Sequence, residues 1–378
     1  MADRNVRPTN MGKARYVMIG GFLGAGKTTA ILRLARHLSG QGLKVGLITN
    51  DQSLGLVDTA MLGANGFDVE EITGGCFCCR FNSLVQAAEK LSETTRPDVF
   101  VAEPVGSCTD LKASVSYPLR RIYGDDFSIA PLSVMMDPVR AMRVLGLERG
   151  AAFSEKVRYV YSKQLEEAEA LVINKIDLIS EERREALKGA LAERFPTTRV
   201  FEISARQGEG LREWFEWLAT TELGTTVAPD LDYEIYADGE AMLGWLNCTV
   251  KWTGPRAFDG NRALKDLASR IHDWLASQEI EIAHLKMTLT PDEDLGDIGV
   301  INLVRSDGKV EQSHSLPEPL ESGELIINLR AEADPEALKV AVLQSLGAPG
   351  EVDVVARVEH LEHFRPGKPS PTHRLASA

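Results

Sequence analysis

The order of apolar and polar positions divides the chain into two halves of different character. As far as about residue 220, short apolar runs alternate with helical stretches. The apolar runs typical of buried strands are residues 16–19, 171–173 and 200–203. Helical periodicity follows at residues 29–35, 181–193 and 211–218. Because strands that alternate with helices build a parallel sheet, the first half predicts an α/β fold with flanking helices.

The second half predicts a smaller domain. Its expected strands are residues 246–252, 281–289, 298–305 and 324–329, and its expected helices are residues 263–276 and 335–346. This β-α-β-β-β-α order predicts an α+β domain with an antiparallel sheet. From Glu359 onward, prolines and a glycine predict an irregular tail that carries His360, His363 and His373.

These patterns, in a chain of 378 residues of which 44% are hydrophobic, predict two domains. We place the first at residues 1–222 and a linker with glycine, threonine and proline at 223–232. The α+β domain then covers residues 233–350, and the tail covers residues 351–378.

Residues 21–28 read Gly-Phe-Leu-Gly-Ala-Gly-Lys-Thr, a complete match to the phosphate-binding loop G-x-x-x-x-G-K-[ST]. A strand precedes this octet and a helix follows it, so backbone N–H groups and the helix N-terminus point at phosphate oxygens. Lys27 is expected to reach the β- and γ-phosphates, and the Thr28 hydroxyl is expected to ligate Mg²⁺. The residues predicted to bind the triphosphate are Gly24, Ala25, Gly26, Lys27, Thr28 and Thr29.

Residues 171–178 read Leu-Val-Ile-Asn-Lys-Ile-Asp-Leu, which places polar groups at the end of a predicted strand. The Asp177 carboxylate can accept hydrogen bonds from guanine N1–H and the 2-amino group, a donor pair that adenine lacks. The Lys175 stem can lie along the purine, and Asn174 can brace the loop. Ser204 and Ala205 resemble a further GTPase element whose backbone contacts the guanine oxygen. The predicted nucleotide is GTP.

Three of the five cysteines lie within Gly74-Gly75-Cys76-Phe77-Cys78-Cys79. The other two stand alone, and this clustering differs from the spacing of a disulfide framework. Neighbouring side chains of a regular strand point to opposite faces, so Cys78 and Cys79 can share a ligand only from a loop. Thiolates at this density suit Zn²⁺ or another divalent transition metal such as Co²⁺, bound by Cys76, Cys78 and Cys79. Candidates for a fourth ligand are water, a carboxylate and a residue of a second subunit in a homodimer.

The three motifs, in this order and spacing, resemble the CobW family of P-loop GTPases, which is related to the urease and hydrogenase nickel-insertion GTPases. The resemblance covers roughly residues 14–220. Residues 48–51 resemble a family strand that ends in Asn-Glu, with Asp51 in place of the glutamate. Asp58 matches the acidic residue a few positions further on. Residues 99–106 resemble the family's E-x-x-G switch segment and place Glu103 in it, and Asp137 ends another apolar segment as the family's acidic residue does.

The resemblance implies the roles of these residues. Asp51 and Glu103 would be switch carboxylates that ligate Mg²⁺ or orient the attacking water, and Lys27 completes the catalytic set. The family is implicated in metal delivery or metallocofactor assembly at the expense of GTP hydrolysis. The expected protein is therefore a metallochaperone whose C-terminal domain recognises a client metalloenzyme or cobalamin-dependent protein. Two alternatives stay open: a GTPase that remodels such an enzyme without metal transfer, and a P-loop small-molecule kinase.

Charge and hydropathy limit the classes of partner and the location that are expected. The formal net charge of −13 argues against a nucleic-acid or anionic-membrane surface. Residues 1–13 are polar and no apolar run is long enough to span a bilayer, which predicts neither a signal peptide nor a membrane helix. Clustered thiols without such a signal fit a reducing cytoplasm.

Overall fold

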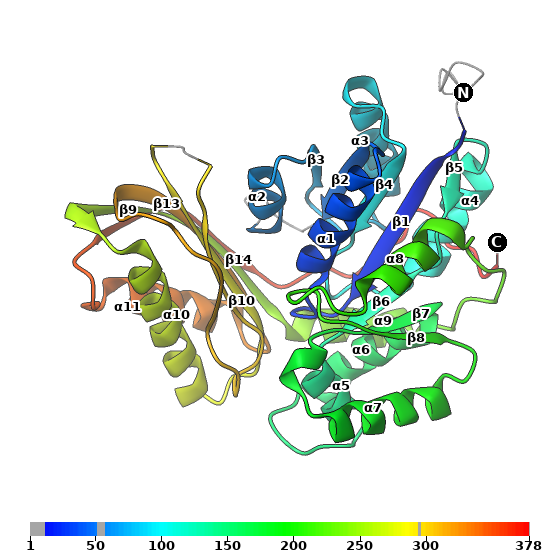
Figure 1. Ribbon diagram of the computed structural model, residues 1–378. Coiled ribbons are helices and arrows are strands. Elements are labelled where there is room, and N and C mark those ends of the chain that lie inside the picture. The colour runs from blue at the N-terminus through cyan, green and yellow to red at the C-terminus, as the bar shows by residue number, and fades with distance from the viewer. Residues whose placement is uncertain (1–11, 51–56, 294–295, 378) are drawn as a thin grey trace.

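The computed structural model describes residues 12–50, 57–293 and 296–377, which form two domains side by side (Figure 1). In this described part, the first domain contains an eight-stranded parallel sheet in the order β3-β2-β4-β1-β6-β7-β8, with β5 paired to β1. Its strands are β1 (Ala14–Gly21), β2 (Val45–Asn50), β3 (Val69–Ile72), β4 (Val99–Glu103), β5 (Phe127–Ile129), β6 (Ser133–Met136), β7 (Ala170–Ile173) and β8 (Arg199–Glu202).

Helices cover both faces of this sheet. They are α1 (Lys27–Gly40), α2 (Val57–Ala64), α3 (Phe81–Thr94), α4 (Tyr117–Tyr123), α5 (Pro138–Val144), α6 (Glu155–Glu167), α7 (Glu181–Arg194), α8 (Leu211–Thr220) and α9 (Tyr233–Met242), with a π-turn at Lys112–Ser116 and a 3₁₀ turn at Ile176–Leu178. Along β1, Tyr16 and Met18 join the core under α3 and α6, whereas Val17 and Ile19 join the core under α1 and α8. Since successive side chains of a strand point to opposite faces, continuous apolar strands require this double cover. The predicted α/β fold is confirmed.

The second domain is the predicted α+β unit. Its antiparallel sheet has the order β12-β11-β10-β13-β9-β14 among the described residues. Its elements are β9 (Gly244–Phe258), α10 (Gly260–Ser277), β10 (Ile282–Pro291), β11 (Gly299–Leu303), β12 (Glu311–His314), β13 (Leu320–Ala331), α11 (Pro335–Gly347) and β14 (Val355–Phe364). Both helices lie on the outer face of the sheet, and the other face is turned toward the first domain (Figure 1).

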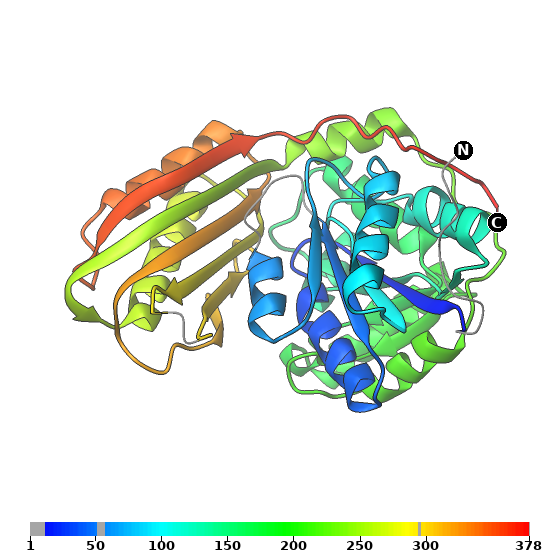
Figure 2. The same cartoon turned by 90° about the horizontal axis from the view of Figure 1, so that it is seen from above.

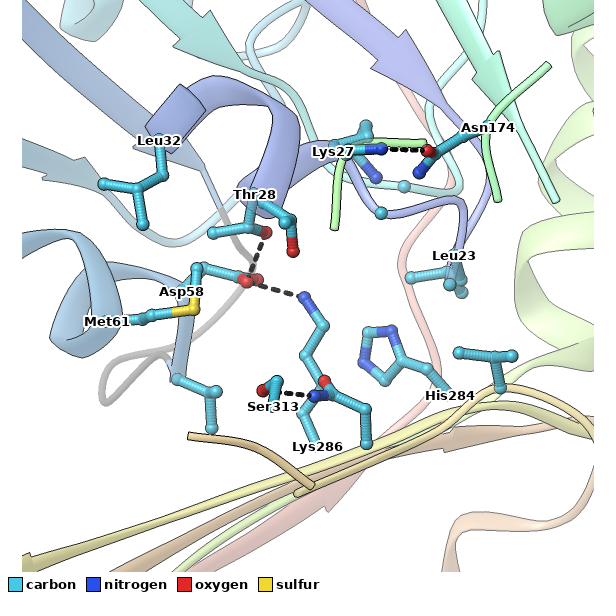
Figure 3. Close-up of a pocket in the computed structure, with 18 of the residues that line it drawn as sticks. Leu23, Lys27, Thr28, Leu32, Asp58, Met61, Asn174, His284, Lys286 and Ser313 are labelled. Atoms are coloured by element: carbon cyan, nitrogen blue, oxygen red, sulfur yellow. Dashed lines mark hydrogen bonds and ion pairs between the residues drawn. The ribbon is translucent and has the colours of Figure 1, made fainter. Parts of the chain in front are cut away.

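Strand β10 shows why the second sheet has one apolar and one polar face. Leu285, Met287 and Leu289 are fully buried in the core beneath α10 and α11. The alternate positions His284 and Lys286 point the other way, into a cavity between the domains (Figure 3). The strict alternation of apolar and polar residues therefore sends polar side chains toward the first domain.

Arg140 in α5 forms hydrogen bonds with both domains. Its guanidinium is buried and donates to the carbonyls of Leu23 (3.3 Å), Ile282 (3.0 Å), Ala283 (3.4 Å) and Val304. Because one acceptor belongs to the phosphate-loop region and three belong to the second domain, the position of the second sheet is tied to that loop.

The C-terminal segment corrects one expectation. Residues from Glu359 were expected to be irregular, but residues up to Phe364 form β14, which pairs with β9 from Val355↔Thr253 to Phe364↔Trp245. Five of its ten residues are exposed, and its five apolar residues do not alternate with the polar ones, so its sequence lacks the pattern of a half-buried strand. The chain then runs back across the first domain (Figure 2). His360 and His363 lie on β14, and the His373 ring packs edge-on against Phe81, with ring centroids 4.9 Å apart.

Helix α9 and the segment before it lie on the first domain. Ser107 Oγ donates to Glu240 at 2.7 Å, and Lys156 forms an ion pair with Asp238. Leu223 N donates to Ile129 O at 2.8 Å. No helix within the described ranges has both the length and the apolar character needed to cross a membrane.

Candidate functional site

The phosphate loop and the predicted guanine loop are held together by Asn174. Its Nδ2 donates to Ala25 O at 2.8 Å, and its Oδ1 accepts from Ala205 N at 2.9 Å. All three of these groups come from the ends of parallel strands, where open α/β sheets place their ligands. Asn174 therefore links the phosphate loop to the segment that contains Ala205.

Lys175 makes a second link between the same loops. Its Nζ donates to Gly24 O at 2.8 Å and forms an ion pair with Asp137 at 2.9 Å. Asp137 caps α5 and also pairs with Arg305 of the second domain at 3.2 Å. Burial opposes ionisation of Asp137, but the Lys175 and Arg305 charges outweigh it, so its pKa lies well below the usual range.

A group of oxygen donors surrounds the Thr28 hydroxyl. Thr28 Oγ1 donates to Asp58 Oδ1 at 2.5 Å and lies 3.1 Å from Glu103 Oε1. Lys27 Nζ is 3.8 Å from Glu103 Oε1, and Lys286 Nζ is 2.6 Å from Asp58 Oδ1 (Figure 3). One hydroxyl and two carboxylates make the oxygen-only set that Mg²⁺ prefers, so these residues fit that ion.

The pKa values of the two carboxyl groups shift in opposite directions. For Glu103, burial and the neighbouring Asp58 charge raise the pKa to about 7, and its Oε2 has no hydrogen-bond partner among the described residues. For Asp58, burial acts in the same direction, but the Lys286 charge and the hydrogen bonds from Lys286 and Thr28 outweigh it and lower the pKa. Asp58 is therefore ionised at neutral pH, whereas Glu103 gains or loses its proton near pH 7.

These groups line one cavity of about 300 Å³ between the domains (Figure 3). Predicted site residues that line it are Gly24, Gly26, Lys27, Thr28, Thr29, Glu103, Asn174, Lys175, Asp177, Ser204 and Ala205. Asp177 is exposed in the 3₁₀ turn after β7, where a purine has access to its carboxylate. Ala25 takes part through its carbonyl. Asp51 lies outside the described residues.

The three clustered cysteines converge in a turn before α3. Their sulfur atoms are separated by 2.7 Å (Cys76–Cys78), 3.4 Å (Cys76–Cys79) and 3.6 Å (Cys78–Cys79). Cys76 and Cys78 are buried and Cys79 is half-buried. In a tetrahedral Zn²⁺ site with Zn–S bonds of about 2.3 Å, sulfurs lie about 3.8 Å apart, so the closest pair would open by roughly 1 Å. The donor set and its spacing fit a soft or borderline metal.

The end of strand β2 holds this thiol turn in place. Asn50 Nδ2 donates to Gly75 O at 2.8 Å and to Ile72 O at 3.0 Å, and its Oδ1 accepts from Phe77 N at 2.8 Å. Asn50 directly precedes Asp51, the predicted switch carboxylate. The thiol turn is therefore hydrogen-bonded to the same strand end that leads into the predicted switch.

Cys108 is a neighbour of the thiol cluster that the sequence did not reveal. Hydrogen bonding with Cys108, and then with Cys78 and Cys79, lowers the pKa of the Cys76 thiol. Hydrogen bonding with Cys76 raises the pKa of Cys79 to about 11, and burial raises the pKa of Cys108. Cys76 is therefore the first of these thiols to ionise.

Two further parts of the molecule contribute to these sites without carrying a sequence motif. The C-terminal segment covers the thiol turn, with Ser370 N donating to Cys79 Sγ at 3.2 Å and Thr372 N donating to Cys78 O at 2.9 Å. From the second domain, His284 and Lys286 line the cavity between the domains. The available signal was the polar alternation of β10, but it does not indicate which surface the polar face meets.

Comparison with known proteins relates the first domain to a protein family. The profile of the CobW/HypB/UreG nucleotide-binding domain matches residues 15–202. A protein of Sinorhizobium sp. named zinc chaperone CobW is 28% identical over 221 residues, which is 53% of this chain and 61% of that protein. Zinc chaperone YeiR of Escherichia coli (strain K12) is 31% identical over 175 residues, which is 46% of this chain and 50% of that protein. The chain thus spans between half and about three fifths of these two relatives.

Among solved structures, the hydrogenase maturation factor HypB from Archaeoglobus fulgidus is 21% identical, with a TM-score of 0.39 over 55% of this chain and 89% of that one. HypB from Helicobacter pylori in complex with nickel is 18% identical, with a TM-score of 0.41 over 55% of this chain and 86% of that one. The profile match covers the phosphate loop, the thiol turn and the Asn-Lys-x-Asp motif. Residues 15–202 therefore form a nucleotide-binding domain of the CobW/HypB/UreG family.

Proposed function

We propose that this protein is a GTP-hydrolysing metallochaperone that couples its nucleotide state to the binding and release of a divalent transition metal. Membership of the family and Asp177 at the base side of the cavity support GTP. Relatives named zinc chaperones and three convergent thiols support Zn²⁺ as the first metal to test, with Co²⁺ second. The recipient would be a metalloenzyme or a cobalamin-dependent protein in a reducing cytoplasm, recognised by the second domain.

One observation carries this proposal: the nucleotide cavity and the thiol cluster share two short segments. Glu103 ends β4 at the cavity, and Cys108, five residues later in the chain, interacts with Cys76. On the other side, Asn50 ends β2 and holds the thiol turn. A nucleotide-dependent shift of either strand end would therefore move a thiol or its immediate neighbour.

Each of four cavity residues would have a separate role in hydrolysis. Lys27 would place its charge at the β- and γ-phosphates, where negative charge moves in the transition state. Thr28 and Asp58 would hold Mg²⁺, which supplies charge neutralisation at the β- and γ-phosphate oxygens when bound. Glu103, whose second carboxyl oxygen has no partner among the described residues, would accept a hydrogen bond from the attacking water and orient it.

A four-way titration tests the proposal. Zn²⁺ is titrated into reduced wild type and into the Cys76→Ser/Cys78→Ser/Cys79→Ser triple variant, each with and without a non-hydrolysable GTP analogue. We expect about one Zn²⁺ per wild-type chain, protons released on binding, and an affinity that the analogue changes. By linkage, Zn²⁺ must change the affinity for the analogue by the same factor. Indistinguishable isotherms in all four titrations would contradict the proposal.

A further inference from the structure

The second domain contributes part of the wall of the nucleotide cavity. A Cβ atom at Gly24 of the phosphate loop would lie 2.9 Å from the Val304 side chain and 3.2 Å from Ala283 O. The second domain is therefore packed directly on the phosphate loop. Two side chains of β10, His284 and Lys286, extend from the polar face of its sheet into the cavity (Figure 3).

Lys286 lies in the group of residues that fits Mg²⁺. Its ammonium is 2.6 Å from Asp58 Oδ1, and that oxygen accepts from Thr28 Oγ1 at 2.5 Å. Lys27 is paired with Glu103 in the same corner. Two ammonium groups thus face two carboxylates, a balanced arrangement that changes once a triphosphate brings further negative charge. If Thr28 and Asp58 held Mg²⁺, Lys286 would turn its ammonium from Asp58 toward the phosphates.

The environment of His284 independently indicates a ligand in the cavity. Its side chain is 7% exposed, and neither ring nitrogen has a hydrogen-bond partner among the described residues. Figure 3 shows the ring directed into the cavity beside Lys286 and near Leu23. A buried polar group without a partner is costly, and native structures rarely retain one without a reason. An oxygen acceptor bound in the cavity would provide the missing partner.

We propose that Lys286 and His284 form a recognition site for the terminal phosphate of a nucleoside triphosphate, supplied by the second domain. Lys286 Nζ donates to a γ-phosphate oxygen, and the His284 ring donates an N–H to another. GDP lacks this phosphoryl group, so only the triphosphate bridges the phosphate loop and the second sheet. This inference rests on the proposed function for the presence of the nucleotide, and it adds that the second domain distinguishes GTP from GDP.

Binding measurements on the full chain test this site. Lys286→Met is compared with Lys251→Met, whose lysine also pairs with an aspartate (Asp292) on the second sheet but does not line the cavity. The probes are the β,γ-imido analogue of GTP and GDP, both with Mg²⁺. We expect Lys286→Met to weaken the analogue at least about tenfold more than GDP, because a charged hydrogen bond to phosphate is lost. Lys251→Met should change both affinities less than twofold.

Equal weakening of the analogue and GDP by Lys286→Met would overturn the inference, since it would assign Lys286 a structural role only. A wild type that binds neither nucleotide would contradict the proposed function itself and the inference with it. A measurement on wild type covers the case in which the variant does not fold. With ¹⁵N-labelled histidine, the His284 ring resonances, assigned with His284→Asn, should shift on adding the analogue but not GDP. Ring resonances that respond identically to both nucleotides would overturn the inference.

Discussion

The Asn174 amide occupies the space in which any side chain at Gly26 would lie. A Cβ atom at Gly26 would be 2.4 Å from Asn174 Nδ2. Gly26 also has a φ of +92°, a backbone angle that residues with a side chain rarely adopt. The glycine of the phosphate loop and the asparagine of the guanine motif are thus fitted to each other. Two motifs separated by almost 150 positions in the sequence therefore pack together as one unit.

The first prediction concerns this unit. Asn174→Ala removes the hydrogen bonds to Ala25 O and from Ala205 N. At about 1 kcal/mol for each bond, GTP and GDP affinities should fall together by about 30-fold. Fluorescence titration with labelled GTP and GDP measures both. Unchanged affinities would show that the two loops keep their positions without the brace.

The second prediction concerns the base. Asp177 is exposed and lines the cavity, so its carboxylate is available to accept from guanine N1–H and the 2-amino group. Wild type should bind GTP at least about 100-fold more tightly than ATP, because two charge-assisted hydrogen bonds at ~1.5–3 kcal/mol each are lost with adenine. Asp177→Asn should shift the preference toward xanthosine triphosphate, whose 2-oxo group can accept from the amide. Competition binding decides, and equal GTP and ATP affinities in wild type would refute the assignment of Asp177.

Glu103 carries the third prediction. Its carboxyl group lies 3.1 Å from Thr28 Oγ1 and 3.8 Å from Lys27 Nζ, the two residues expected to hold the triphosphate and Mg²⁺. Glu103→Ala should lower single-turnover GTP hydrolysis by at least about 100-fold, because a positioned acid–base group contributes about that much. GDP affinity should stay nearly unchanged. Lys27→Ala, the comparison variant, should lose hydrolysis altogether. Wild-type hydrolysis in Glu103→Ala would rule out a catalytic role for this residue.

The sequence indicates those parts of the site whose backbone is set within a few residues. The phosphate loop, the Asn-Lys-x-Asp turn and the thiol turn are contiguous, so residue type and spacing identify them. Lys286 and His284 are ordinary polar positions of a strand until the second sheet packs on the phosphate loop. Cys108 likewise gains meaning only when the segment after Glu103 folds beside Cys76. Contacts of this kind depend on tertiary packing and leave no local pattern.

Edge strands were missed for a related reason. β12 (Glu311–His314) and β14 (Val355–Phe364) lie at opposite edges of the second sheet. Each pairs on one side only. All four residues of β12 are polar, and the five apolar residues of β14 do not alternate with its polar ones, so neither strand shows the apolar alternation that revealed β9 and β10. β14 also pairs with a strand about 100 positions earlier, a distance at which sequence patterns carry no information about register.

The fourth prediction follows from Glu167, which anchors the segment after Cys108. Its buried carboxyl accepts from Thr109 Oγ1 and Lys112 N, each at 3.0 Å, and burial raises its pKa to about 8. Between the unfolded pKa of about 4.3 and about 8, the unfolded chain releases a proton that the folded chain keeps. The contribution of Glu167 is therefore fully present at low pH and falls by about 1.4 kcal/mol per pH unit across this window.

Urea unfolding of metal-free protein from pH 5 to 8 measures this contribution. Relative to wild type, Glu167→Gln should gain free energy of unfolding as the pH rises, because the amide does not ionise. Glu166→Gln is the matched control, since that neighbouring carboxyl is only partly buried and pairs with Lys163. A constant difference between wild type and Glu167→Gln across the window would mean that Glu167 ionises normally in the folded protein.

The fifth prediction concerns the C-terminal segment over the thiols. Arg374 pairs with the buried Asp110 at 2.9 Å, and this ion pair fixes the chain just after Ser370, whose N–H meets Cys79 Sγ. Arg374→Ala removes a charged hydrogen bond worth about 1.5–3 kcal/mol, so the segment should leave the thiol turn more often. Alkylation of Cys79 in reduced, metal-free protein should accelerate at least about tenfold, measured by peptide mass spectrometry. Arg357→Ala, which alters an exposed pair with Glu359 on β14, should leave the rate unchanged. Equal alkylation rates in wild type and Arg374→Ala would show that the segment does not limit access to Cys79, and metal exchange would then need another route of control.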